Sequence, residues 1–115
     1  LAAAALVAAC GDEDTYGAIA FSHNTTRAAI VTRGWTQSEA NDAARDRCDA
    51  RYCEVVLQFR ECGALSAGTL PGGRLIIGVA EGRSTLEAQT AANHACSANG
   101  GENCRDIPGL APRCN

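Results

Sequence analysis

Cysteines are the residues of this sequence with the widest choice of chemistry, because a thiol can form a disulfide, bind a metal ion, accept a lipid or act as a nucleophile. There are seven, and six of them fall in the later part of the chain: Cys48, Cys53, Cys62, Cys96, Cys104 and Cys114. No C-x-x-C pair occurs, and neither histidine stands at ligand spacing to two cysteines, so we expect no metal site and no cofactor. Six cysteines can close three disulfides with no thiol left over, which is typical of exported proteins.

The seventh cysteine, Cys10, ends an apolar run that reads LAAAALVAA over residues 1–9. The run resembles a bacterial secretory signal, and Val7-Ala8-Ala9-Cys10 resembles a lipobox, whose cysteine accepts a diacylglycerol. We therefore expect a signal-peptide remnant over 1–9, a lipidated linker over 10–15 and a single domain over 16–115. The alternative is an ordinary secretory signal with a chance cysteine. Either interpretation places the protein in the bacterial envelope or periplasm, and the first anchors it to a membrane through Cys10.

The other nucleophiles and bases lack partners. Ser66, within Ala64-Leu65-Ser66-Ala67-Gly68, imitates a nucleophile elbow, but such an elbow needs a following helix, and turn residues follow here. His23 lies in a polar turn and His94 late in a predicted helix, and pairing of the six cysteines would leave neither a thiolate to activate. We expect no catalytic residues, and a small exported hydrolase with a cryptic site near either histidine is the alternative.

Length and charge narrow the class further. The chain has 115 residues, a formal charge of −3 and only 4% aromatic residues. This length allows one domain, and the mildly acidic balance with dispersed arginines argues against a nucleic-acid partner. A core so poor in bulky side chains needs covalent support, which the cysteines can supply.

An internal repeat provides the elements that position these residues. Residues 36–48 match residues 84–96 at a constant offset of 48: each begins with a capping box (T/S-x-x-E), continues with an alanine stripe and ends at a cysteine. Apolar runs flank each predicted helix, and the expected strands are 16–21, 27–32, 53–59, 62–67, 74–79 and, at an edge because of Pro108, 104–110. The sequence thus predicts a ββαβ unit written twice, over about 16–61 and 62–114. We expect a pseudo-twofold, disulfide-stapled α+β domain with a mainly antiparallel sheet and both helices on one side.

Strand geometry restricts the disulfides. If residues 53–62 are extended, nine steps separate their ends by roughly 30 Å, far beyond the reach of a disulfide. Short loops favour Cys48–Cys53 and Cys96–Cys104, and Cys62–Cys114 then remains.

These residues carry a resemblance to a known family. The segment Tyr16-Gly17-Ala18-Ile19-Ala20, a Gly-Trp before a capped helix, and C-x4-C-x-VV-x-x-F-x-x-CGAL together resemble the DUF4189 family of exported bacterial domains. The resemblance runs from Tyr16 to about Ala95. It implies a secreted, periplasmic or cell-surface protein and implies no catalytic residues, while the segment 106–109 departs from the family pattern and leaves the last strand in doubt.

A binding role is the hypothesis that fits these expectations best. Trp35 is expected to pack onto Ala40 as a hydrophobic staple, but its counterpart in the second repeat is Arg83, so the fold does not demand it. Exposed aromatic residues and arginines are common at interfaces. The expected binding surface comprises Trp35, Arg33, Arg83 and Tyr52. We expect a non-enzymatic lipoprotein that binds another envelope or secreted protein, as an inhibitor or immunity-like module would; a structural or stress-related envelope protein is the other alternative.

Overall fold

The computed structural model describes residues 15–49 and 51–115, which form two ββαβ units in succession. Cys10, the signal-like run and the linker up to residue 14 lie outside these residues. The first unit comprises β1 (Tyr16–Phe21), β2 (Ala28–Gly34), α2 (Gln37–Cys48) and β3 (Glu54–Phe59). The second comprises β4 (Cys62–Thr69), β5 (Leu75–Gly82), α3 (Thr85–Ala98), β6 (Glu102–Asp106) and the short β7 (Arg113–Cys114).

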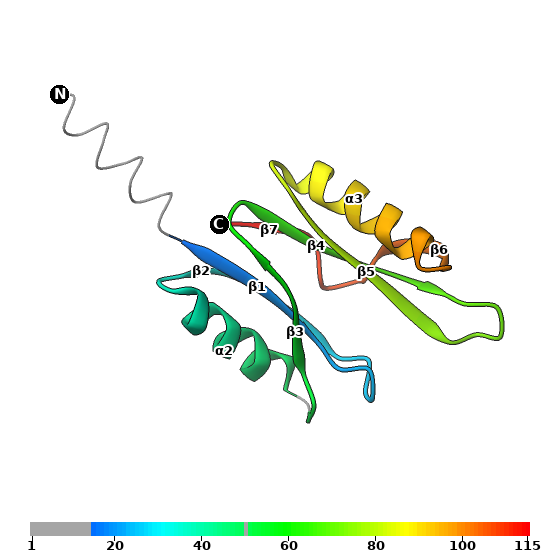
Figure 1. Ribbon diagram of the computed structural model, residues 1–115, viewed down its shortest axis with the longest axis horizontal. Coiled ribbons are helices and arrows are strands. Elements are labelled where there is room, and N and C mark those ends of the chain that lie inside the picture. The colour runs from blue at the N-terminus through cyan, green and yellow to red at the C-terminus, as the bar shows by residue number, and fades with distance from the viewer. Residues whose placement is uncertain (1–14, 50) are drawn as a thin grey trace.

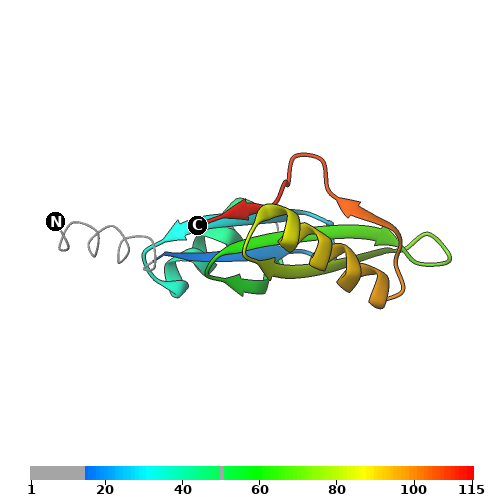
Figure 2. The same cartoon turned by 90° about the horizontal axis from the view of Figure 1, so that it is seen from above.

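The two units share one topology, so the predicted duplication and the α+β class are confirmed. Each begins with an antiparallel hairpin whose first strand lies at the centre of its sheet, in the orders β2-β1-β3 and β5-β4-β6 (Figure 1). The last strand β6 lies at an edge and ends at Asp106, because Pro108 cannot donate to a ladder. The chain then loops away from the sheet and returns as β7, which pairs with the start of β4 (Figure 2).

The arrangement of the layers differs from the expected single sheet with both helices on one side. The strands form two sheets of three and four strands, which contact each other through a cluster containing Ile19, Ile30, Phe59 and Leu65. Ala18 and Ala20 point away from this cluster and pack under α2, whereas Ala64 packs under α3. Side chains alternate between the faces of a strand, so each helix covers the outward face of its own sheet. The sequence gives each unit its own alanine-lined helix face and its own aliphatic inner face, which favours this layering.

Both helices begin at the predicted capping boxes. The Glu39 amide donates to Thr36 Oγ1 at 3.0 Å, and the Glu87 amide donates to Ser84 Oγ at 3.1 Å. The buried residues of the two helices follow the same spacing and are Ala40, Ala44 and Cys48 in α2 and Ala88, Ala92 and Cys96 in α3. Small side chains on this stripe let each helix lie close to its sheet.

Phe59 joins the two units at the centre of the molecule. Its ring is 1% exposed, and a Cβ added to either Gly17 or Gly63 would collide with it. These glycines occupy the same position in β1 and β4, so each unit contributes one wall of the slot that holds the ring. Only glycine leaves room for so close an approach to the backbone.

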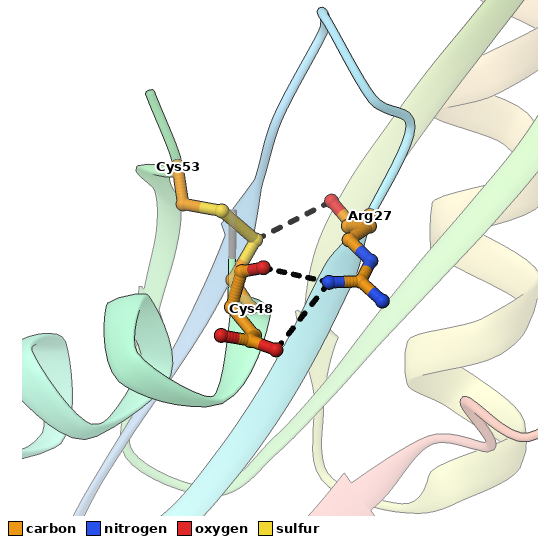
Figure 3. A network of polar contacts seen from close by, with 4 residues as sticks. Arg27, Cys48 and Cys53 are labelled. Atoms are coloured by element: carbon orange, nitrogen blue, oxygen red, sulfur yellow. Dashed lines mark hydrogen bonds and ion pairs between the residues drawn. A yellow bond between two sulfur atoms is a disulfide. The ribbon is translucent and has the colours of Figure 1, made fainter. Parts of the chain in front are cut away.

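The three disulfides of the described residues are Cys48–Cys53, Cys62–Cys114 and Cys96–Cys104, which are the expected pairs. Two of them tie a helix end to the strand that follows, and the third ties β7 to β4. At the end of α2, Arg27 Nη1 donates to the Asp49 carbonyl at 2.7 Å, and Cys48 Sγ lies 3.4 Å from the Arg27 carbonyl oxygen (Figure 3). A guanidinium at this position compensates the negative end of the helix dipole.

Candidate binding surface

The structure separates the four expected surface residues into two groups. Arg33 lies near the end of β2 and Trp35 between β2 and α2, and Arg83 lies at the place equivalent to Trp35, between β5 and α3. Both helices begin at the same end of the molecule, on the left in Figure 1. Tyr52 follows α2, which spans about 18 Å, and therefore lies toward the other end. Tyr52 is therefore remote from the other three, and these are themselves divided, because α2 and α3 cover opposite outward faces of the two packed sheets.

Trp35 does not pack as a staple, so that interpretation is wrong. Its exposed fraction is 77%, the highest among the exposed large hydrophobic residues of the described chain. The reason is visible at its neighbours: a Cβ on Gly34 would already lie 2.8 Å from Ala40 Cβ, so the strand and helix touch directly and leave no space for an indole. The indole therefore stands in solvent, and tryptophan is among the residues that most often dominate binding at protein interfaces.

The backbone next to Trp35 is held in an uncommon conformation. Arg33 has φ of 65°, in the left-handed region. Its amide donates to Asn115 Oδ1 at 2.7 Å, and the Asn115 side chain also donates to the Arg60 carbonyl at 3.0 Å. Asn115 is next to the disulfide-bonded Cys114, so a covalent link and two hydrogen bonds fix the segment that leads to the tryptophan. Strained backbone of this kind is found most often at functional positions.

Leu86 is another exposed residue at the same end of the molecule, and it was not among the surface residues expected from the sequence. It lies in the first turn of α3, three residues after Arg83, with an exposed fraction of 76%. Its position offered a signal: it lies two residues before Ala88, which places it about 200° around the helix from the buried stripe. Arg33 and Trp35 are called the helix-cap surface below, and Arg83 and Leu86 stand at the equivalent end of the second unit.

Charge at the helix-cap surface, and at the equivalent end of the second unit, is balanced by the capping boxes. Glu39 Oε1 accepts from the Trp35 amide at 3.4 Å, and Glu87 Oε1 accepts from the Arg83 amide at 3.1 Å. The Arg83 guanidinium approaches Glu87 at 3.8 Å and is 81% exposed, so it stays available to a partner. The helix-cap surface can offer one indole and the guanidinium of Arg33 to a partner.

The residues examined for catalysis are distributed over the fold. Ser66 lies within β4, is fully buried, and donates to the Arg105 carbonyl at 3.3 Å, so it forms no elbow. His94 is exposed on α3, and His23 is exposed in the β1–β2 turn, where its ring packs edge-on against Phe21 at 4.9 Å. Within residues 15–49 and 51–115 there is no group of three or more His, Cys, Asp or Glu residues placed to hold a metal ion. In the same residues, neither helix has the length and apolar character needed to cross a bilayer.

Comparison with known proteins gives one match. A family model described as "Domain of unknown function (DUF4189)" matches residues 16–107. No curated protein and no solved structure matches the chain.

Proposed function

Since the chain belongs to the DUF4189 family, we propose that it is an exported protein-binding module of the bacterial cell envelope, lipid-anchored through Cys10 and without a catalytic step of its own. Its three disulfides are compatible with an oxidising compartment outside the cytoplasm. The proposed partner is another envelope or secreted protein, bound as an inhibitor or immunity-like module binds its target.

The observation that carries the proposal is the exposure of Trp35. A chain with one tryptophan places it 77% in solvent, on a segment fixed by Asn115 and the Cys62–Cys114 disulfide. Tryptophan and arginine are the residues that most often dominate binding energy at protein interfaces, and a rigid scaffold loses little entropy when they are buried. Arg33, two residues before Trp35, supplies part of the rim of such an interface.

The binding role is tested by comparing two exposed aromatic residues. The protein and its Trp35→Ala and Tyr52→Ala variants are each cross-linked in envelope extracts, and the partner recovered with the wild type is purified. Calorimetric titration then measures its Kd for all three proteins. We expect Trp35→Ala to weaken binding at least tenfold and Tyr52→Ala to change it less than threefold. Equal binding by all three proteins would refute the role of the helix-cap surface.

The lipid anchor is tested separately, because it does not depend on the partner. The intact mass of protein extracted from membranes should exceed the mass of the chain from Cys10 onward by that of a diacylglycerol or a fully acylated cysteine. Cys10→Ser should release the protein into the soluble fraction. A wild-type protein recovered without lipid in the soluble fraction would favour the ordinary secretory signal.

A further inference from the structure

A second candidate site lies at the opposite end of the molecule from the helix-cap surface. The β1–β2 turn, toward the bottom of Figure 1, and the β4–β5 turn, at its right, both lie at this end, and residues of the two hairpins line an open cavity of ≈ 480 Å³. Phe21, His23 and Thr26 line it from the first unit, and Leu70, Arg74, Leu75 and Ile76 line it from the second. A cavity of this size fits a small organic ligand.

The arginine in this cavity, Arg74, differs in its contacts from Arg27, which also stands just before the second strand of a hairpin. Arg27 and Arg74 both stand at the entry to the second strand of their hairpins. Arg27 is committed to structure, because its guanidinium binds the carbonyl and carboxylate of Asp49 at the end of α2. Arg74 makes no ion pair or side-chain hydrogen bond among the described residues; the ion pairs there involve Arg27, Arg45 and Arg83. The strand pairing aligns Arg27 with Ile76, so Arg74 stands two residues farther toward its turn, and its guanidinium is available to a ligand.

The other residues that line the cavity determine the chemistry of the rest of a ligand whose anionic group binds Arg74. Leu70, Leu75 and Ile76 offer aliphatic surface, and Leu75 is 41% exposed although it is a large apolar residue. Phe21 is buried, and its edge-on contact with His23 keeps the imidazole at the cavity wall. Among the described residues that line the cavity, none is acidic. One positive group among apolar walls selects a ligand that has one negative group and an apolar body.

The backbone of the cavity wall is also strained. Thr26 has φ of 59°, a left-handed conformation that is rare for a β-branched residue. The Thr26 amide donates to the Ser22 carbonyl at 2.8 Å, which holds the turn in this shape. A turn maintained at such a cost is more common at functional sites than elsewhere.

We propose that the cavity between the two hairpin turns binds a small amphiphilic carboxylate, with the carboxylate on Arg74 and the apolar body against Leu70, Leu75 and Ile76. His23 contributes a ring N–H as a second donor. Fatty acids of medium length and aromatic carboxylates have this chemistry. The site is independent of the partner proposed for the helix-cap surface.

Calorimetric titration of the native, disulfide-bonded protein with octanoate tests this proposal. Arg74→Gln removes the charge but keeps much of the side-chain length, and Arg47→Gln on the exposed face of α2 is the matched control. We expect Arg74→Gln to weaken octanoate binding at least tenfold and Arg47→Gln to change it less than twofold. 1-Octanol, which lacks the anion, should bind at least tenfold more weakly than octanoate, and acetate, which lacks the apolar body, should bind as weakly as octanol.

Amide NMR shifts locate the binding independently of the variants. Octanoate should shift the resonances of His23, Thr26 and Leu75 and leave those around Trp35 unchanged. Shifts confined to other residues, equal binding of octanoate by the wild type and Arg74→Gln, or absence of binding at millimolar octanoate would each overturn the proposal. Binding to phosphatidylglycerol vesicles without binding to octanoate would overturn it as well, and would assign the cavity to a membrane surface instead.

Discussion

The two ββαβ units can be compared position by position. They differ at exposed positions whose side chains have no role in packing. Both keep a glycine before the helix, a hydroxyl cap with a glutamate three residues on, an alanine stripe and a closing cysteine, and in both these groups make the same contacts. In contrast, Trp35 in the first unit stands where Arg83 stands in the second, and both are exposed. The positions that match build the scaffold, and the exposed positions that differ are the ones available for function.

The two helices occupy equivalent positions in their units but pack differently against the second strand of their sheets. A Cβ on Gly78 would collide with the backbone of α3, so that helix lies directly on β5. In the first unit the strand pairing aligns the buried Ala29 with Gly78, and Ala29 packs in the cluster between β2 and α2. The third strands differ as well, since β3 is apolar (EVVLQF) and β6 is polar (ENCRD).

The first prediction concerns a substitution that removes the central contact between the two units. Phe59→Ala removes the ring that both Gly17 and Gly63 enclose, and the loss of a fully buried aromatic side chain costs about 3–5 kcal/mol of unfolding free energy. Urea unfolding followed by circular dichroism measures the change. Because the ring is shared, we expect the remaining stability to be lost in a single transition. A loss below about 1 kcal/mol would show that the units do not depend on this contact.

The second prediction ranks the disulfides. Cys62 and Cys114 are separated by 52 residues, whereas Cys48 and Cys53 are separated by 5. Chain-entropy estimates give about 4 kcal/mol for the longer loop and about 2 kcal/mol for the shorter one. Paired Cys→Ala variants of each bridge, compared by chemical unfolding, should therefore differ by about 2 kcal/mol. The opposite order would mean that the Cys62–Cys114 bridge does not constrain the unfolded chain as proposed.

The third prediction concerns a feature that the units share. Thr36→Ala and Ser84→Ala each remove one hydrogen bond to a helix amide and should each cost about 1 kcal/mol. The two losses should add in the double variant, because the caps belong to different helices and share no partner. Thermal unfolding of the two single variants and the double variant measures this. An effect at only one cap would show that the helices contribute unequally to the stability of the domain.

The fourth prediction has the smallest expected effect on the free energy of unfolding. It gives the first unit the residue that the second unit has at the equivalent position. Trp35→Arg replaces an exposed indole with the residue found at the equivalent position and should change the unfolding free energy by less than about 0.5 kcal/mol. The same unfolding experiment measures it. A loss of more than about 1 kcal/mol would mean that the indole packs in solution and would return Trp35 to a structural role.

Much of the fold could be predicted because its signals are local. A capping box, an alanine stripe and a strand between two cysteines each depend on a few neighbouring residues, and the disulfide pairs followed from strand length. The division into two sheets depends on Phe59 meeting glycines from both units, a contact between distant residues that no local pattern encodes. The expected surface of Trp35, Arg33, Arg83 and Tyr52 stays a prediction, and the structure shows that these residues do not form one patch. The exposure of Trp35 could not be predicted, because it depends on how closely Gly34 and Ala40 approach.

Binding of the purified partner to Trp35→Arg tests the central claim most directly, because this variant keeps the fold and removes only what distinguishes the first unit at the helix-cap surface. The account predicts that Kd rises at least tenfold relative to the wild type. An unchanged Kd would contradict it, since the exposed tryptophan would then make no contribution to recognition.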